Sequence, residues 1–267
     1  MITNEILKQA NNLLSNGKIH DCISLLESEV DNGFKARILI LKNLFGQNKR
    51  AETLGTITRE DYQVNINNII SKLTDLLDEL SSIAKVKIYF IGHSSVAMTP
   101  ISFENEFNTI KNVIADSSDL ILYEKVIGSL DELNLLLAEQ GEVILHFACH
   151  GNIGGLFLAD ENGIDKYETN TRVLEFLRQF SSRIKGVILN ACLSENLGKN
   201  LANNISTVIC MNKEVKDESS VNYAKFFYSY LNNIFDFEMA HNYTKNALKL
   251  KADDTIFTVD LIKKTNI

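Results

Sequence analysis

The chain has 267 residues, of which 45% are hydrophobic and 23% charged, and this balance excludes a disordered or fibrous protein. Asp and Glu number 34 against 27 Lys and Arg, so the net charge of −7 argues against nucleic acid or an anionic membrane as the main partner. Four cysteines are too few for a secreted disulfide scaffold. With no apolar run of about 18 residues and no leader-like start, we expect a cytoplasmic protein without a membrane segment.

The first part of the chain predicts a small all-α domain over residues 1–82. Apolar residues at helical spacing predict helices over residues 6–14, 22–30, 36–45 and 58–80. We expect Asn16-Gly17 and Asn32-Gly33 to end the first two helices. The stretch Thr58-Arg-Glu-Asp61 resembles a capping box, in which Thr58 accepts from a backbone N–H and Asp61 reaches back. The apolar stripe behind it must be buried against its neighbours, which implies a helical bundle.

From Val86 onward, short apolar runs alternate with helical stretches. The runs predict strands over residues 86–91, 120–123, 143–147, 187–191 and 207–211, with a last strand over 255–259. The predicted helices cover residues 103–114, 129–138, 171–180, 194–203, 219–232 and 237–250. This alternation is typical of a mostly parallel sheet with helices on both faces, so we predict an α/β domain over residues 85–267.

Two predicted strand ends carry residues suited to covalent catalysis. One strand continues into Cys149-His150-Gly151, and another continues into Cys192. Catalytic groups of α/β sheets gather beyond the carboxyl ends of strands, and a thiolate is the stronger nucleophile at neutral pH. His150 would supply the base or ion-pair partner, and the backbone N–H groups of Gly151 and Cys192 would form an oxyanion hole. A buried core cysteine beside a structural histidine is the alternative interpretation.

These segments resemble a known family. The stretches His146-Phe-Ala-Cys-His-Gly151, Gly155-Leu-Phe-Leu-Ala-Asp160 and Val187-Ile-Leu-Asn-Ala-Cys-Leu-Ser194 are similar to the CHAT family of caspase-like cysteine proteases. The resemblance covers about residues 85–250. It implies a caspase-like fold, a catalytic dyad of His150 and Cys192, an oxyanion hole that includes Gly151, and a protein or peptide substrate. One departure is Cys210, which stands where the family often has glycine.

The helical part has a resemblance of its own. Residues 36–41, 50–55, 58–61 and 65–69 are similar to an effector-associated domain of the eleventh type. Such domains are small death-domain-like adaptors in bacterial conflict systems. The resemblance implies that residues 2–82 recruit an upstream sensor or a like adaptor domain, and that the chain acts in antiviral defence.

Three further residues are candidates for a substrate pocket. His93 follows the first predicted strand, Asn190 precedes Cys192 by two residues, and Asp217 lies after the strand over 207–211. Asp217 would favour a basic residue before the scissile bond, whereas it also fits a helix cap, and the neutral Asn190 weakens a basic preference. A solvated loop position is the alternative for His93. The cysteine and histidine spacings match no standard zinc site, so we expect neither metal nor cofactor.

Three functional hypotheses follow. The first is a cysteine endopeptidase, held weakly active until it is recruited or clustered. The second is a catalytically silent scaffold that acts through protein–protein interaction, although both dyad positions carry competent residues. The third is another hydrolase or an acyltransferase that uses the same Cys–His pair, since a fold alone does not define a reaction.

Overall fold

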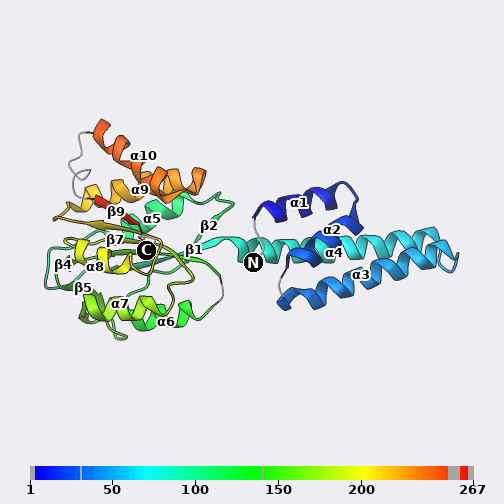
Figure 1. The fold of residues 1–267 in the computed structure, drawn as a ribbon, viewed down its shortest axis with the longest axis horizontal. Helices are drawn as coiled ribbons and strands as arrows, with labels where there is room; N and C mark the ends of the chain where they lie inside the picture. Colours follow the sequence, from blue (N-terminus) through cyan, green and yellow to red (C-terminus); the bar gives the residue numbers. More distant parts are fainter. Residues whose placement is uncertain (1–3, 31, 140, 252–258, 264–267) are drawn as a thin grey trace. The chain divides into compact units, whose positions relative to one another are not determined.

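The computed structural model describes residues 4–30, 32–139, 141–251 and 259–263. The chain divides into two compact units, Met1–Lys85 and Val86–Ile267. Each unit has its own hydrophobic core (Figure 1). Across the described residues, no helix combines the length and apolar character needed to cross a bilayer.

The N-terminal unit is a bundle of helices, as the sequence predicts. Its helices are α1 (Asn4–Ser15), α2 (Ile19–Glu29), α3 (Asn32–Thr53) and α4 (Arg59–Ala84). Their apolar faces meet in one core that includes Leu26, Ile38 and Leu73, all fully buried. Between α3 and α4, Asn48 Nδ2 donates to the Tyr62 carbonyl oxygen at 3.2 Å. The all-α class predicted for this part is therefore confirmed.

One local prediction in this unit is wrong, and a second holds in a different form. Asn32-Gly33 begins α3 instead of ending α2, which stops earlier because Val30 is extended (φ −94°, ψ 142°). At the start of α4, the Thr58 hydroxyl oxygen accepts from the Asp61 N–H at 3.0 Å, as expected. The second half of the capping box differs, because the Asp61 carboxylate accepts the Thr58 O–H at 2.7 Å instead of a backbone N–H.

The second unit is built on a six-stranded sheet in the order β2-β1-β3-β7-β8-β9. Neighbouring strands pair in parallel except β8 and β9, which are antiparallel. The strands are β1 (Val86–His93), β2 (Leu120–Leu122), β3 (Val143–Cys149), β7 (Ile184–Asn190), β8 (Thr207–Met211) and β9 (Val259–Lys263). The predicted last strand over 255–259 lies outside the described residues except Val259, the first residue of β9.

Helices cover both faces of this sheet. In Figure 1, α5 (Phe103–Val113), α9 (Asp217–Ile234) and α10 (Phe237–Leu250) lie on one side, and α6 (Leu130–Leu137), α7 (Asn170–Arg178) and α8 (Glu195–Leu201) lie on the other. Every residue of β3 is buried, and its side chains alternate between the two cores: Leu145 and Phe147 face one, while Ile144 and Ala148 face the other. The predicted class, a mostly parallel α/β sheet after a helical bundle, is thus confirmed.

A second, smaller sheet has no counterpart in the sequence-based prediction. It consists of β4 (Gly151–Asn152), β5 (Gly155–Ala159) and β6 (Asp165–Thr169), paired antiparallel in that order. Gly155 allows the close pairing, because a Cβ there would lie 2.2 Å from the Glu168 carbonyl oxygen. The hairpin follows directly on β3, so it fixes the chain immediately after His150.

Candidate active site

Cys192 and His150 line the same cavity. Strands β3 and β7 are parallel neighbours with Ala148 opposite Asn190, so His150 and Cys192 both lie just beyond the carboxyl edge of the sheet. The cavity measures about 50 Å³, with a buried floor and a half-buried rim. Both residues belong to the rim, and both are partly accessible to solvent. The two residues that the sequence predicts as a catalytic pair therefore line one cavity.

The Cys192 thiol contacts the segment that follows β8. Its Sγ accepts from the Val215 N–H at 3.4 Å, and the thiol faces the Val215 carbonyl oxygen at 3.9 Å. Leu193, the next residue, has φ 56°, in the left-handed region that a leucine rarely adopts. Such backbone strain persists where surrounding structure holds it, and it gathers at functional sites. Here the Leu193 N–H donates to the Lys213 carbonyl oxygen at 3.4 Å.

His150 has an unused ring nitrogen at the cavity. Its Nε2 is buried and has no hydrogen-bond partner within the part of the chain that the structure describes. The neighbouring side chain, Cys149, is buried and packs in the core on the α6–α8 side of the sheet. Burial raises the pKa of Cys149 well above its usual value, and the nearby Glu106 and Cys192 add to the shift. Cys149 is therefore a core thiol and no nucleophile.

The other two cysteines are also buried. Burial raises the pKa of Cys22 to about 11 and that of Cys210 to about 12, the latter with a contribution from Asp260. Cys192 is the most accessible of the four thiols. A thiol that is both buried and high in pKa reacts slowly at neutral pH, which leaves Cys192 as the candidate nucleophile.

Gly151 brings a backbone N–H close to Cys192. A Cβ at this position would lie 2.7 Å from the Cys192 carbonyl oxygen and 3.1 Å from Ala191 Cβ, so only glycine allows this approach. The Phe157 N–H donates to the His150 carbonyl oxygen at 2.9 Å, which makes 150 and 157 a hydrogen-bonded pair of the β4–β5 ladder. Gly151 and Leu156, the next pair, are then a non-hydrogen-bonded pair. The Gly151 N–H consequently points away from β5, on the open edge of β4.

A buried polar chain lies beneath the cavity. His146 is fully buried in β3, and its Nε2–H donates to Glu106 Oε1 at 2.6 Å. The Tyr228 hydroxyl lies 3.1 Å from the other ring nitrogen, His146 Nδ1. The Asn190 amide donates to the same Glu106 oxygen at 2.5 Å and to the Ser220 carbonyl oxygen at 3.3 Å. Glu106 and Asn190 both line the cavity.

No role is predicted from the sequence for Glu106, His146 or Tyr228. Two signals point to them. His146 interrupts an otherwise apolar strand, and a buried imidazole there requires hydrogen-bond partners. Glu106 falls within the buried stripe of α5 that contains Phe107 and Ile110, where a carboxylate requires a donor.

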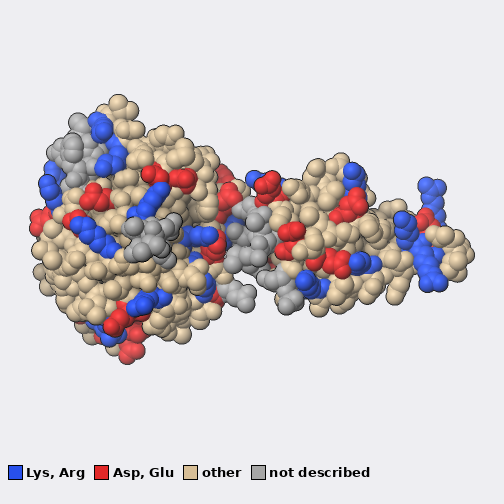
Figure 2. Space-filling model, in the orientation of Figure 1, with Lys and Arg blue, Asp and Glu red and all other residues tan. Residues whose placement is uncertain are grey.

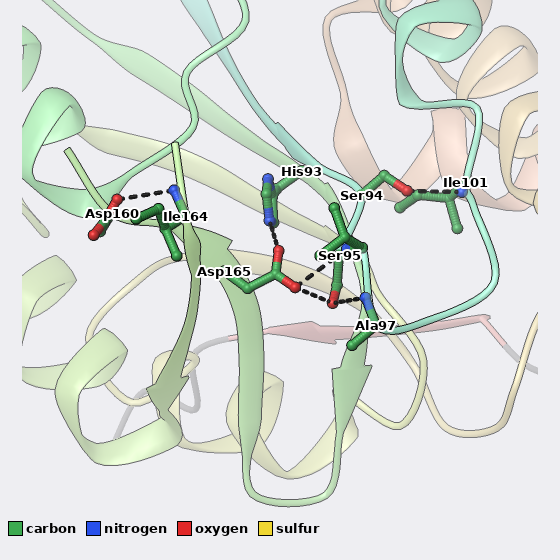
Figure 3. A network of polar contacts seen from close by, with 9 residues as sticks. His93, Ser94, Ser95, Ala97, Ile101, Asp160, Ile164 and Asp165 are labelled. Atoms are coloured by element: carbon green, nitrogen blue, oxygen red, sulfur yellow. Dashed lines mark hydrogen bonds and ion pairs between the residues drawn. The ribbon is translucent and has the colours of Figure 1, made fainter. Parts of the chain in front are cut away.

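His93 does not line the cavity. Its Nε2–H donates to Asp165 Oδ1 at 2.7 Å, while Asp165 Oδ2 accepts from the Ser95 hydroxyl at 2.6 Å and the Val96 N–H at 3.1 Å (Figure 3). These bonds, led by the one from Ser95, lower the pKa of Asp165 below its usual value. The cluster joins the end of β1 to β6. It is no catalytic triad, because serine and histidine bind the same carboxylate and not each other.

Asp217 anchors the C-terminal end of the segment that joins β1 to α5. It is the first residue of α9, and its carboxylate accepts from the Ser102 N–H at 3.0 and 3.1 Å. It also lines the cavity. The alternative assignment of Asp217 as a helix cap is wrong, because Lys216 occupies the N-cap position and the Asp217 side chain binds another segment. The residues between His93 and Ser102 are thus held by Asp165 at one end and by Asp217 at the other.

Metal binding has no candidate cluster among the described residues: no group of three or more His, Cys, Asp or Glu side chains is arranged to hold an ion.

On the visible face of the second unit, basic and acidic side chains are interspersed (Figure 2).

Both parts of the sequence are similar to known proteins. Residues 5–81 match the family model of effector-associated domain 11. Over 279 aligned positions the chain is 24% identical to a Roc-COR-CHAT protease from an unknown prokaryotic organism, an alignment that covers 92% of this chain and 26% of that protein. The chain thus spans about a quarter of the length of this curated relative. Both resemblances expected from the sequence, to an effector-associated domain and to CHAT proteases, are confirmed.

A solved structure is also similar to this chain. It is the X-ray structure of a secreted C11 cysteine protease from Bacteroides thetaiotaomicron in complex with an irreversible peptide inhibitor. The match has a TM-score of 0.48 and 12% sequence identity, and it covers 67% of this chain and 65% of the other.

Proposed function

We propose that this chain is a caspase-like cysteine endopeptidase with Cys192 as the nucleophile and His150 as the proton donor and acceptor. The observation that carries the proposal is that Cys192 and the unpartnered Nε2 of His150 belong to one cavity at adjoining strand ends. The similarity to a Roc-COR-CHAT protease supports it. A catalytically silent scaffold would have no use for an accessible thiol and an unsatisfied buried imidazole nitrogen at one cavity.

The reaction proceeds in two steps. The Cys192 thiolate attacks the scissile carbonyl, and the N–H groups of Gly151 and Cys192 bind the resulting oxyanion. The C–N bond then breaks, and the amine leaves with a proton from the His150 imidazolium. Water, deprotonated by the now neutral His150, attacks the thioester, releases the carboxylic acid and restores the thiol.

The N-terminal unit serves in activation. Its match to effector-associated domain 11 supports recruitment by an upstream sensor or a like domain through residues 2–82, and a role in bacterial antiviral defence. In the resting chain the Cys192 thiol contacts Val215, which fits an enzyme that is held at low activity until it is clustered.

The test compares the four cysteines and then measures cleavage. We expect iodoacetamide at pH 7.5 to label Cys192 at least ten times faster than Cys22, Cys149 or Cys210. Cleavage of a peptide library should rise when the chains are clustered through a fused, drug-induced dimerisation tag. Cys192→Ala should fold normally and cleave nothing.

The control separates the dyad from the fold. His150→Ala should reduce turnover while leaving the melting temperature close to that of the wild type. Equal and slow labelling of all four thiols, with no cleavage after forced clustering, would reject the protease and favour the silent scaffold. Transfer of the acyl group to an added amine instead of water would identify an acyltransferase.

A further inference from the structure

Among the described residues, the end of β7 that leads to Cys192 pairs with a neighbouring strand on one side only. It pairs with β3 as far as Asn190, which lies opposite Ala148. The pairing of β7 with β8 covers Val187 and Ile188 and stops there. A strand end with backbone hydrogen bonds on one side has fewer contacts to hold it in place. The position of Cys192, two residues beyond Asn190, therefore depends on side-chain contacts.

A carboxylate on α5 supplies such a contact. The Asn190 Nδ2–H donates to Glu106 Oε1 at 2.5 Å and to the Ser220 carbonyl oxygen at 3.3 Å. Asn190 is 7% exposed and Glu106 is 3% exposed, so water hardly competes for the first of these bonds. A hydrogen bond to a charged acceptor is about twice as strong as one between neutral groups. Glu106 thus holds the residue that lies two positions before the candidate nucleophile.

The same carboxylate oxygen also binds β3. Glu106 Oε1 and His146 Nε2 lie 2.6 Å apart in a fully buried pair, which is an ion pair when His146 is protonated. His146 lies four residues before His150, and the Tyr228 hydroxyl of α9 is 3.1 Å from its other ring nitrogen. One oxygen atom of α5 therefore joins the two strands that lead to His150 and Cys192.

Helix α5 is itself fixed in place. It is preceded by Ser102, whose N–H donates to the Asp217 carboxylate at 3.0 and 3.1 Å. Phe107, next to Glu106, packs edge-on against Phe90 of β1, with the ring centroids 5.4 Å apart. Because the helix is anchored on both sides of Glu106, the carboxylate sets the position of the strand ends and does not follow their movement.

We propose that Glu106 is a positioning residue for the candidate dyad. Its carboxylate holds β3 through His146 and β7 through Asn190. This joint fixes the distance between His150 and Cys192, which lie just beyond it. The assignment rests on the proposed protease function, since it concerns the two reacting side chains. Misplacement of a reacting group by about 1 Å costs on the order of 100-fold in rate, so loss of the joint should lower kcat. KM should change little, because Glu106 acts through the dyad and not on the substrate.

The experiment uses the full-length, clustered chain and the peptide that it cleaves fastest, and it measures kcat, KM and the melting temperature. Glu106→Ala removes the shared acceptor, and we expect kcat to fall about 100-fold while KM stays within about threefold of wild type. Glu106→Gln keeps an acceptor oxygen at the same place and should retain at least about a fifth of the wild-type kcat. A group that only stabilises the fold would not produce this split between kcat and KM.

Two further variants separate positioning from stability. Asn190→Ala leaves the His146–Glu106 pair in place and removes only the link to β7, so it should fold and lose about 30-fold or more in kcat. Tyr223→Phe is the matched control, because it removes a buried hydrogen bond of 2.7 Å to His241 in the same unit, and neither of these residues lines the cavity. It should lower the melting temperature and leave kcat within about twofold of wild type.

The outcomes separate this assignment from the proposed function. A folded Asn190→Ala protein that keeps more than about a third of the wild-type kcat would overturn the assignment and leave the protease intact, as would an effect confined to KM. If the wild type cleaves no peptide after clustering, the protease itself fails and the assignment with it. Should Glu106→Ala unfold, Asn190→Ala still decides, because it leaves the buried pair intact.

Discussion

Replacing Gly151 by alanine tests the geometry at the nucleophile most directly. The added Cβ would lie 2.7 Å from the Cys192 carbonyl oxygen and 3.1 Å from Ala191 Cβ. Carbon atoms pack at about 3.5–4.0 Å, so the Cys192 backbone must move by several tenths of an ångström. Overpacking of this kind costs about 1–3 kcal/mol, or a fall in melting temperature of roughly 2–12 °C for a unit of this size.

The effect on catalysis should be larger than the effect on stability. Displacement of an oxyanion-hole donor costs about 10²–10³-fold in kcat. The assay measures hydrolysis of the peptide that the wild-type protein cleaves fastest, together with a melting curve and the iodoacetamide labelling rate of Cys192. We expect Gly151→Ala to lose turnover while thiol labelling stays within about threefold of wild type, because alkylation needs no oxyanion hole.

A matched control is available in the same unit. A Cβ at Gly128 would meet Ala159 Cβ at 3.4 Å, an ordinary contact, so Gly128→Ala should keep full turnover. A folded Gly151→Ala protein that retains more than about a third of the wild-type rate would refute the role assigned to this backbone N–H.

Three further predictions concern stability and order. Burial, with a smaller contribution from Lys245, lowers the pKa of His241 to about 4, so His241 takes up a proton on unfolding between pH 6.5 and 4. The free energy of unfolding, measured in urea, should therefore decrease as the pH is lowered from 6.5 to 4, by up to roughly 3 kcal/mol. His241→Gln should make the free energy of unfolding less dependent on pH. An equal slope of free energy against pH in the variant would contradict this. Thr58→Ala should destabilise α4 by about 1 kcal/mol through loss of its cap, measured by hydrogen exchange, whereas Thr74→Ala within the same helix should not destabilise it. Asp165→Asn should accelerate thermolysin cleavage within residues 96–101, since the asparagine offers one acceptor oxygen where the carboxylate offers two, and unchanged cleavage would show that the segment is held by other contacts.

Local signals were enough to predict much of the fold. Strand β8 has the predicted bounds, because the apolar run Thr207–Met211 is enclosed by polar residues on both sides. The caps at Thr58 and Ser129 were also predictable, since each is a hydrogen bond to the backbone three residues along the chain. Burial on both faces makes the central strands continuous apolar runs, which a sequence displays plainly.

The features that sequence reasoning missed depend on distant partners. Strand β6 is polar and half-exposed, and it exists as a strand because β5 pairs with it. The contact between His146 and Glu106 joins residues 40 positions apart, and the one between His93 and Asp165 spans 72. Spacing along the chain predicts which faces are buried, but it does not reveal which polar side chains meet once those faces pack.

The segment that follows β8, residues 213–217, forms three separate contacts. The Lys213 carbonyl oxygen accepts from the Leu193 N–H, and the Val215 N–H donates to the Cys192 thiol. The Asp217 carboxylate accepts from the Ser102 N–H. In the proposed protease, a substitution or insertion in this segment would therefore shift the contact at the Cys192 thiol and the anchoring of Ser102 at the same time.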